Sequence, residues 1–142
     1  MRIGTVREIK NHEYRVGLTP ESVRELHAQG HEVWVETDAG LGIGASDGDY
    51  EEAGGTIKPS AAEVFAECEL IVKVKEPQAV ERAMLREGQL LYTYLHLAPD
   101  PDQTRELVAS GATAIAYRLE PLAPRMCFIT QLTAIARIRF HS

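Results

Sequence analysis

Short apolar runs alternate along the chain with segments of helical periodicity. The apolar runs are rich in Val, Ile, Leu and Tyr and show little polar alternation, which is typical of strands buried on both faces. Turn residues separate the runs, so each is expected to be a separate strand. The expected strands are 3–6, 32–36, 56–58, 70–75, 89–95 and 112–117.

The helical segments carry recognisable start and stop residues. Thr19-Pro20 places an N-cap before a proline at the first helical position, and Gly30 ends that helix. Ser60 and Glu63 have the spacing of a capping box. Helices are expected at 20–29, 47–53, 79–86 and 101–110, with a further short one after Ser60.

The strand and helix order predicts an α/β fold with a mostly parallel sheet and helices on both faces, of the flavodoxin or Rossmann-like kind. In such folds, ligands bind in the crevice beyond the carboxyl ends of the strands. Polar residues that directly follow the strands are therefore the first candidates for a functional site.

Three such residues stand out. Arg15 lies in the loop after the first strand, Lys75 ends the strand at 70–75, and His96 follows the run at 89–95. An arginine fork, an ammonium group and an imidazole at one sheet edge would suit a small carboxylate substrate, with histidine moving the proton. Taken singly, each is more often a solvated, snorkelling or packing residue, so the hypothesis depends on their shared position.

The segment Gly40-Leu41-Gly42-Ile43-Gly44-Ala45 fits a loose dinucleotide-binding pattern after a strand. However, it starts three residues beyond the strand, and the next helix begins with Asp47 and Asp49, which would repel a pyrophosphate. The following strand ends in Lys58 rather than an acid. We therefore interpret this loop as a structural turn or subunit-contact loop and predict no cofactor-binding residue in this chain.

Composition and charge narrow the function classes. The chain has 142 residues, 44% apolar residues and a net charge of −6. Residues 1–117 carry −9 and residues 118–142 carry +3. An acidic body argues against a nucleic-acid partner, and no apolar run reaches the roughly 18 residues that cross a bilayer. Two cysteines and scattered histidines predict no metal site, and a cytoplasmic location is expected.

Several segments resemble the N-terminal domain of alanine dehydrogenases. They are Arg7 to Val16, Val74-Lys75-Glu76-Pro77, Thr93 to Ala98 and Ala112 to Tyr117, in the family's order. The related transhydrogenase domain normally lacks the histidine segment and the Lys-Glu-Pro setting. The resemblance implies that Arg15 holds the substrate carboxylate, Lys75 contacts the substrate and His96 is the catalytic acid/base.

The implied reaction is the reversible conversion of L-alanine, NAD and water to pyruvate, ammonia and NADH. The resemblance covers about residues 1–117, and the basic tail 118–142 is expected to diverge from the family. The resemblance also leads us to expect that the family's NAD-binding domain is not part of this chain. We interpret the tail as the product of truncation or an altered reading frame, with a genuine short form as the alternative.

Three functions remain open at this point. The chain is a substrate-side domain of alanine dehydrogenase that is inactive alone, a transhydrogenase-type domain that works with a separate NAD-binding chain, or a non-catalytic binding or oligomerisation module. The small-molecule partner is L-alanine or pyruvate. Because the missing domain would leave apolar surface uncovered, a homo-oligomer is expected.

Overall fold

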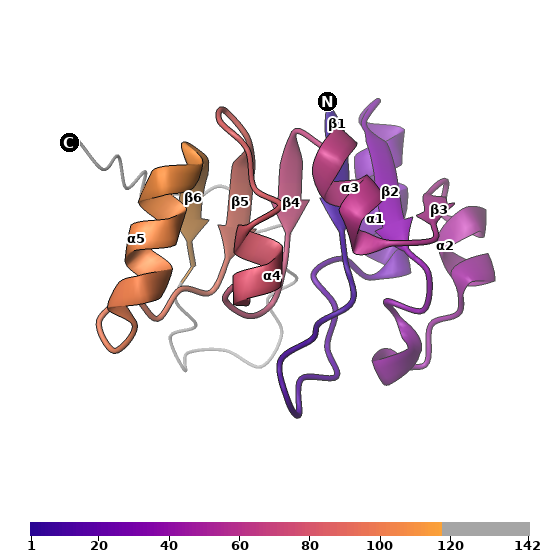
Figure 1. The fold of residues 1–142 in the computed structure, drawn as a ribbon. Helices are drawn as coiled ribbons and strands as arrows, with labels where there is room; N and C mark the ends of the chain where they lie inside the picture. Colours follow the sequence, from indigo (N-terminus) through magenta and orange to yellow (C-terminus); the bar gives the residue numbers. More distant parts are fainter. Residues whose placement is uncertain (118–142) are drawn as a thin grey trace.

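Six short strands pair side by side in one sheet in this computed structural model, which describes residues 1–117. All neighbouring strands run parallel, in the order β3-β2-β1-β4-β5-β6 (Figure 1). This confirms the predicted parallel α/β fold. The strands are β1 Arg2–Thr5, β2 Glu32–Glu36, β3 Thr56–Lys58, β4 Leu70–Val72, β5 Leu90–Thr93 and β6 Thr113–Ala116.

The chain enters the sheet in its middle. It builds outward through β2 and β3, crosses back to the other side of β1, and then builds outward again through β4, β5 and β6. Gly4 of β1 is thus in register with Trp34 on one side and with Ile71 on the other. The point where the direction reverses, between β1 and β4, is where ligands bind in folds of this kind.

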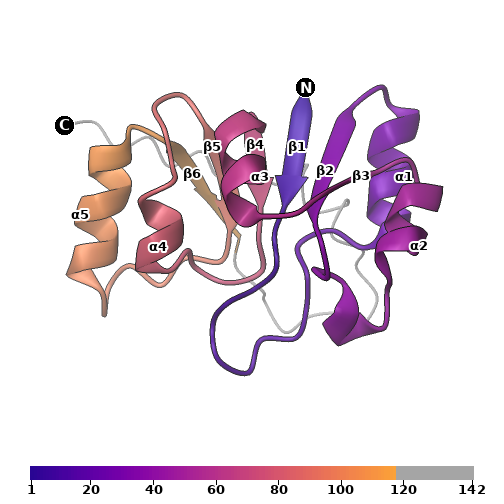
Figure 2. The ribbon, with the colours of Figure 1, turned by 45° about the vertical axis from the view of Figure 1, so that its right-hand side comes forward.

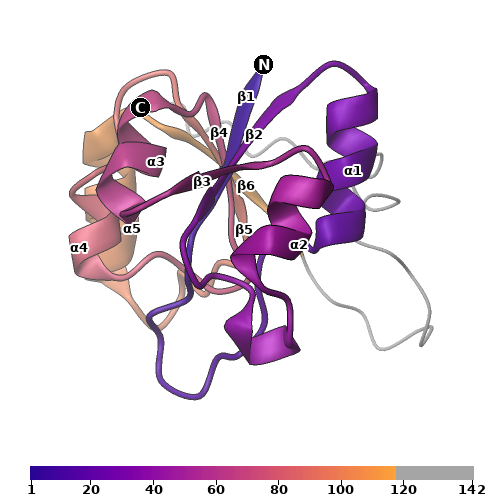
Figure 3. The same cartoon turned by 90° about the vertical axis from the view of Figure 1, so that its right-hand side faces the viewer.

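Helices cover both faces of the sheet. Figure 3 shows α1 and α2 on one side and α3, α4 and α5 on the other. The helices are α1 Pro20–Ala28, α2 Asp47–Glu52, α3 Ala61–Glu67, α4 Ala79–Arg82 and α5 Pro101–Ser110, and a 3₁₀ turn, η1, spans Leu41–Ile43.

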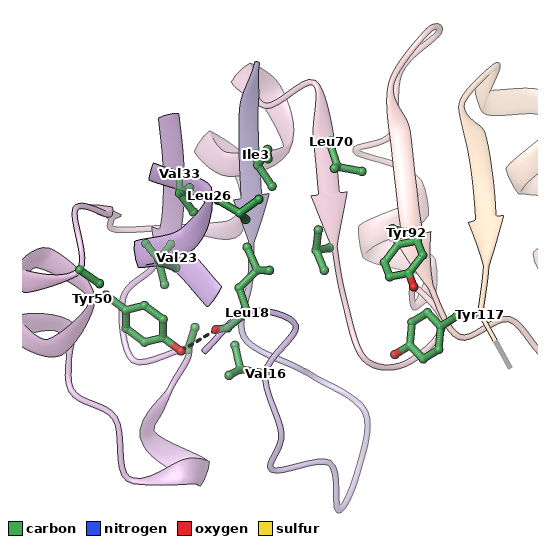
Figure 4. Close-up of a cluster of buried hydrophobic side chains, with 14 residues drawn as sticks. Ile3, Val16, Leu18, Val23, Leu26, Val33, Tyr50, Leu70, Tyr92 and Tyr117 are labelled. Atoms are coloured by element: carbon green, nitrogen blue, oxygen red, sulfur yellow. Dashed lines mark hydrogen bonds between the residues drawn. The ribbon is translucent and has the colours of Figure 1, made fainter. Parts of the chain in front are cut away.

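Each face of the sheet has its own hydrophobic cluster. On the first face, Val23 and Tyr50 from α1 and α2 pack against strand residues such as Val33, as Figure 4 shows. The Tyr50 hydroxyl donates a hydrogen bond of 2.8 Å to the Leu18 carbonyl, which satisfies a polar group inside the cluster. On the opposite face, the fully buried Phe65 of α3 belongs to the second cluster. The sheet is therefore a central layer between two cores.

The local start and stop signals work largely as predicted. The Thr19 side chain accepts from the Ser22 N–H at the start of α1, and Gly111 ends α5 with a left-handed φ of 70°. Ser60 accepts from the Glu63 N–H at 3.4 Å, which is the forward half of the expected capping box. These contacts satisfy backbone groups that the helix ends leave unpaired.

Several elements are shorter than predicted. The strands expected over 89–95 and 112–117 span only Leu90–Thr93 and Thr113–Ala116. Two further elements end early for a reason visible in the structure. The strand expected over 70–75 ends at Val72. The Lys73 N–H still donates to the Tyr92 carbonyl of β5, but the Val74 N–H donates to the Glu8 carboxylate at 2.7 Å instead of to a neighbouring strand. The helix expected over 79–86 ends at Arg82, where tighter turns bring Leu85 into the second cluster. In both places, a contact made by the tertiary fold overrides the local pattern.

Candidate functional site at the carboxyl edge of the sheet

The three predicted site residues lie in loops at one edge of the sheet. Arg15 is in the loop after β1, Lys75 is in the loop after β4, and His96 is in the loop after β5. Because every strand runs parallel, these loops all leave from the carboxyl ends of the strands, which form the lower edge in Figures 1 and 2. The strands β1, β4 and β5 are neighbours, so the three loops follow one another along that edge.

Arg15 is held by the carboxylate of Glu13. The Arg15 Nε and Nη2 groups donate to the two Glu13 oxygens at 2.8 and 2.7 Å, and the Glu13 carboxylate also accepts from the Arg15 backbone N–H. The Arg15 hydrogen bonds lower the pKa of Glu13 to about 2, and the charge of Lys75 contributes in the same direction. The Arg15 side chain remains 54% exposed, so part of the guanidinium faces outward.

The backbone of Lys75 is fixed on two sides. Its N–H donates to the Glu8 carboxylate at 3.4 Å, and its carbonyl accepts from the Thr93 hydroxyl at 2.6 Å. The Lys75 ammonium lies 5.4 Å from the centre of the Tyr94 ring, in the range of a cation–π contact. Lys75 is thus tied to the loops on both sides of its own.

His96 also contacts Tyr94. The Tyr94 hydroxyl and His96 Nε2 are 3.3 Å apart, and the two rings meet edge to face with centres 5.0 Å apart. The His96 carbonyl accepts from the Gln103 amide of α5 at 3.1 Å. The imidazole itself is exposed, which leaves it accessible to a small molecule.

The three residues are therefore linked to one another by two further side chains. Glu13 lies between Arg15 and Lys75 electrostatically, and Tyr94 lies between Lys75 and His96. A cavity of about 280 Å³ opens beside Arg15 and is lined also by Glu8 and Glu13. The lining of that cavity includes neither Lys75 nor His96.

Tyrosine side chains pack next to the loops at this edge of the sheet. Tyr117, at the end of β6, donates its hydroxyl to the Val74 carbonyl at 2.8 Å, and burial raises the pKa of that hydroxyl. Its ring centre lies 5.1 Å from Tyr92 and 6.4 Å from Tyr94, and Figure 4 shows Tyr92 and Tyr117 close together. The sequence reasoning missed these roles, although the alternation in Tyr92-Thr93-Tyr94 was a signal that the two rings lie on one face.

A buried ion cluster lies beneath the loops after β1 and β4. The Lys73 ammonium, which is fully buried, contacts Glu8 at 3.2 Å and Glu81 at 2.6 Å. Burial raises the pKa of Glu8, and the charge of Lys73 acts against that shift. The sequence reasoning missed this cluster as well, because its members are spread over three segments and Lys73 reads as an ordinary strand residue.

The glycine loop is a packing element in this structure. A Cβ at Gly42 would collide with the backbone carbonyl of Tyr14, so the glycine allows the loop to pack against the segment next to Arg15. The helix that follows is capped by its own Ser46 and Asp49, and the Asp49 carboxylate accepts from the Ser46 N–H at 2.7 Å. These residues do not fit the pyrophosphate of a dinucleotide, which needs free N–H groups and no competing carboxylate.

Other site types find no support within residues 1–117. No group of three or more metal-binding side chains comes together there. No helix in this part of the chain has the length and hydropathy needed to cross a bilayer. Burial raises the pKa of the Cys68 thiol to about 12, so this cysteine is an unreactive core residue. The basic segment 118–142 lies outside the described residues.

Comparison with known proteins identifies relatives of this chain. Curated alanine dehydrogenases match the chain, with 54% identity over 117 residues in Halomonas elongata and 45% over 137 residues in Methanococcus maripaludis. These alignments cover 82% and 96% of this chain but only 32% and 37% of the relatives. The chain thus spans about a third of the length of the curated relatives it matches.

Solved structures show the same fold. An L-alanine dehydrogenase structure superposes with a TM-score of 0.80 at 50% identity, covering 82% of this chain and 32% of that chain. A transhydrogenase from Sinorhizobium meliloti gives a TM-score of 0.78 at 28% identity, covering 87% and 37%. The likeness is closer in sequence to the dehydrogenase.

The family model described as "Alanine dehydrogenase/PNT, N-terminal domain" matches residues 4–137. This match continues past residue 117, where the sequence reasoning places the end of the resemblance. The match covers nearly the whole chain, and the fold and the relatives agree with it. The chain therefore belongs to the alanine dehydrogenase/PNT N-terminal domain family.

Proposed function

We propose that this chain is the substrate-side domain of an NAD-dependent alanine dehydrogenase and that it binds L-alanine or pyruvate at the carboxyl edge of its sheet. The observation that carries the proposal is the placement of Arg15, Lys75 and His96 on the loops after three neighbouring parallel strands. The names of the most similar relatives support the substrate class.

Each of the three residues has a proposed role that fits its chemistry. Arg15 binds the substrate carboxylate through guanidinium N–H groups beyond those that Glu13 occupies. Lys75 contacts and polarises the oxygen or nitrogen on the reacting carbon. His96 moves a proton to or from that group, because an imidazole ring nitrogen can both accept and donate a proton.

The full reaction proposed is L-alanine plus NAD and water giving pyruvate, ammonia and NADH. In that reaction NAD accepts the hydride. The described residues supply only the substrate side, since the glycine loop does not fit a dinucleotide. We therefore expect the 142-residue chain to bind pyruvate and to have no turnover alone. A cytoplasmic setting, a role in L-alanine catabolism and a homo-oligomeric state belong to the same proposal.

Pyruvate binding to the 142-residue chain tests the proposal. A titration followed by ¹⁵N nuclear magnetic resonance should shift the amides around Arg15, Lys75 and His96. Arg15→Met should weaken binding about tenfold or more, because charged hydrogen bonds to the carboxylate are lost. Arg105→Met is the matched control, since Arg105 is an exposed arginine on α5 that pairs with Asp102 of the same helix.

Other results would contradict the proposal. Equal pyruvate affinity in Arg15→Met and in the Arg105→Met control would exclude Arg15 from the site. In a full-length dehydrogenase carrying this domain, His96→Ala should remove turnover and leave pyruvate binding largely intact. Unchanged turnover would exclude His96 as the acid/base.

Two further functions remain as outcomes of activity assays. NADH formation that appears only after a separate NAD-binding chain is added would indicate a transhydrogenase-type arrangement, which the similarity to the Sinorhizobium meliloti structure keeps open. Self-association without pyruvate binding would indicate an oligomerisation module. Light scattering measures that association directly.

A further inference from the structure

We propose that Glu8 is a positioning residue that holds the backbone of Val74 and Lys75 and thereby directs the Lys75 ammonium toward the substrate. This inference rests on the function proposed above, in which Lys75 contacts the substrate. It adds a residue that belongs to a different loop and that does not itself need to touch the substrate.

The first support is where Glu8 reaches. Glu8 follows β1, and its carboxylate crosses the switch point of the sheet to the loop after β4. There it accepts from the Val74 N–H at 2.7 Å and from the Lys75 N–H at 3.4 Å. One oxygen takes the first donor and the other oxygen takes the second, so the carboxylate binds the two successive peptide groups as a pair.

The second support is that the hydrogen bonds to Glu8 take the place of strand-to-strand hydrogen bonds. The strand ends at Val72, and the Val74 N–H donates to the carboxylate. A buried N–H without a partner is costly, so a carboxylate at this point determines where the backbone turns. Because a side chain follows its own backbone, the turn also sets the direction in which Lys75 leaves it.

The third support is that Glu8 is itself immobilised. Its side chain is only 2% exposed, and the Lys73 ammonium contacts it at 3.2 Å. A carboxylate fixed in this way is a rigid acceptor, as positioning residues behind reactive groups must be.

Lys75 has a second restraint that fits the same purpose. Its carbonyl accepts from the Thr93 hydroxyl at 2.6 Å, and its ammonium lies against the Tyr94 ring. Glu8 holds the peptide on the β1 side, whereas Thr93 holds it on the β5 side. The lysine therefore extends from a backbone that is fixed both by the loop after β1 and by the end of β5.

A double-mutant cycle on pyruvate affinity separates positioning from a general structural role. Glu8→Gln removes the charge and turns one acceptor into a donor facing the Lys75 N–H. In the 142-residue chain it should weaken pyruvate binding about tenfold. Lys75→Ala should weaken it by a similar or larger factor. Combined with Lys75→Ala, the Glu8→Gln change should have almost no further effect, because its influence passes through Lys75.

Glu81→Gln is the matched control, because it removes a carboxylate from the same buried lysine and leaves the bonds to Val74 and Lys75 in place. It should change pyruvate affinity less than about twofold. If Glu8→Gln weakens binding equally with and without the Lys75 side chain, or if Glu81→Gln weakens it as much, the positioning role is wrong. If Lys75→Ala itself has no effect, the proposed function fails at Lys75 instead.

A measurement on the unaltered chain applies if Glu8→Gln does not fold. The Val74 and Lys75 amides should exchange with solvent at least about tenfold more slowly than unprotected amides, because a buried carboxylate accepts from both. Exchange of the Lys75 amide at the rate of an unprotected peptide would overturn the proposal.

Discussion

Replacing Lys73 by methionine should destabilise the domain more than most single changes. The side chains of Lys73, Glu8 and Glu81 are 0%, 2% and 3% exposed. Methionine fills a similar volume but leaves two carboxylates buried without their cation. Removing one partner of such a buried pair typically costs about 3–5 kcal/mol. That is a large part of the roughly 5–15 kcal/mol that stabilises a domain.

Urea unfolding followed by the fluorescence of Trp34, the single tryptophan, measures this loss. Trp34 is suitable because its ring contacts the Arg2 and Lys58 cations, and unfolding breaks these contacts. With a slope of about 1–3 kcal/mol per molar urea, the midpoint should fall by about 2 M. Glu81→Gln leaves Lys73 one carboxylate partner and should cost only about 1–2 kcal/mol.

The pH dependence provides a second check on the same variant. Burial already raises the pKa of Glu8 in the folded protein, and loss of Lys73 raises it further. An acid whose pKa is higher in the folded state favours folding at low pH, and this contribution is lost as the pH rises through the folded pKa. The cost of Lys73→Met should therefore be smaller at about pH 5 than at about pH 7. An equal cost at both pH values, or a loss below about 1 kcal/mol, would refute the role given to the ion cluster.

Three further changes have defined outcomes. In Glu13→Gln, the free energy of unfolding should fall less on acidification than in the unaltered chain. The pKa of Glu13 is lowered to about 2, so the stability that its carboxylate contributes is lost as the pH falls toward that value. Urea midpoints measured from about pH 5 to pH 2.5 test this. Tyr50→Phe should cost about 1–2 kcal/mol in thermal unfolding, since the buried Leu18 carbonyl loses its donor. Gly42→Ala should weaken pyruvate binding by displacing the loop that carries the guanidinium, whereas Gly48→Ala, whose Cβ would make only an ordinary van der Waals contact with Ser46, should not.

Local signals predicted most of the fold because the helices are bounded by side chains that act on their own backbone. The N-caps at Thr19 and Asp100 and the glycine after α5 are interactions within a few residues, so sequence spacing reveals them. The overlong strand at 70–75 shows the limit of such reasoning. It ends where a carboxylate 66 residues earlier in the chain takes its N–H group, and no local pattern contains that contact.

The residues of the candidate site also fall into two groups, those that the sequence predicts and those that depend on tertiary contacts. The rule that ligands bind beyond the carboxyl ends of parallel strands was enough to select Arg15, Lys75 and His96. Their supporting residues were not predictable, because Glu8 and Lys73 meet only when β1 and β4 pair. Tyr94 also depends on tertiary structure, since its contact with Lys75 joins two different loops.

The position of β1 in the middle of the sheet has a consequence for how the protein folds during synthesis. β1 and β2 are only about 30 residues apart along the chain and can pair early, but the other edge of β1 has to wait for β4, 67 residues later. Until that strand leaves the ribosome, β1 presents an apolar edge with unpaired N–H and carbonyl groups. The nascent domain is thus most prone to aggregate in the interval between completion of β3 and arrival of β4, and chaperone binding is expected to concentrate there.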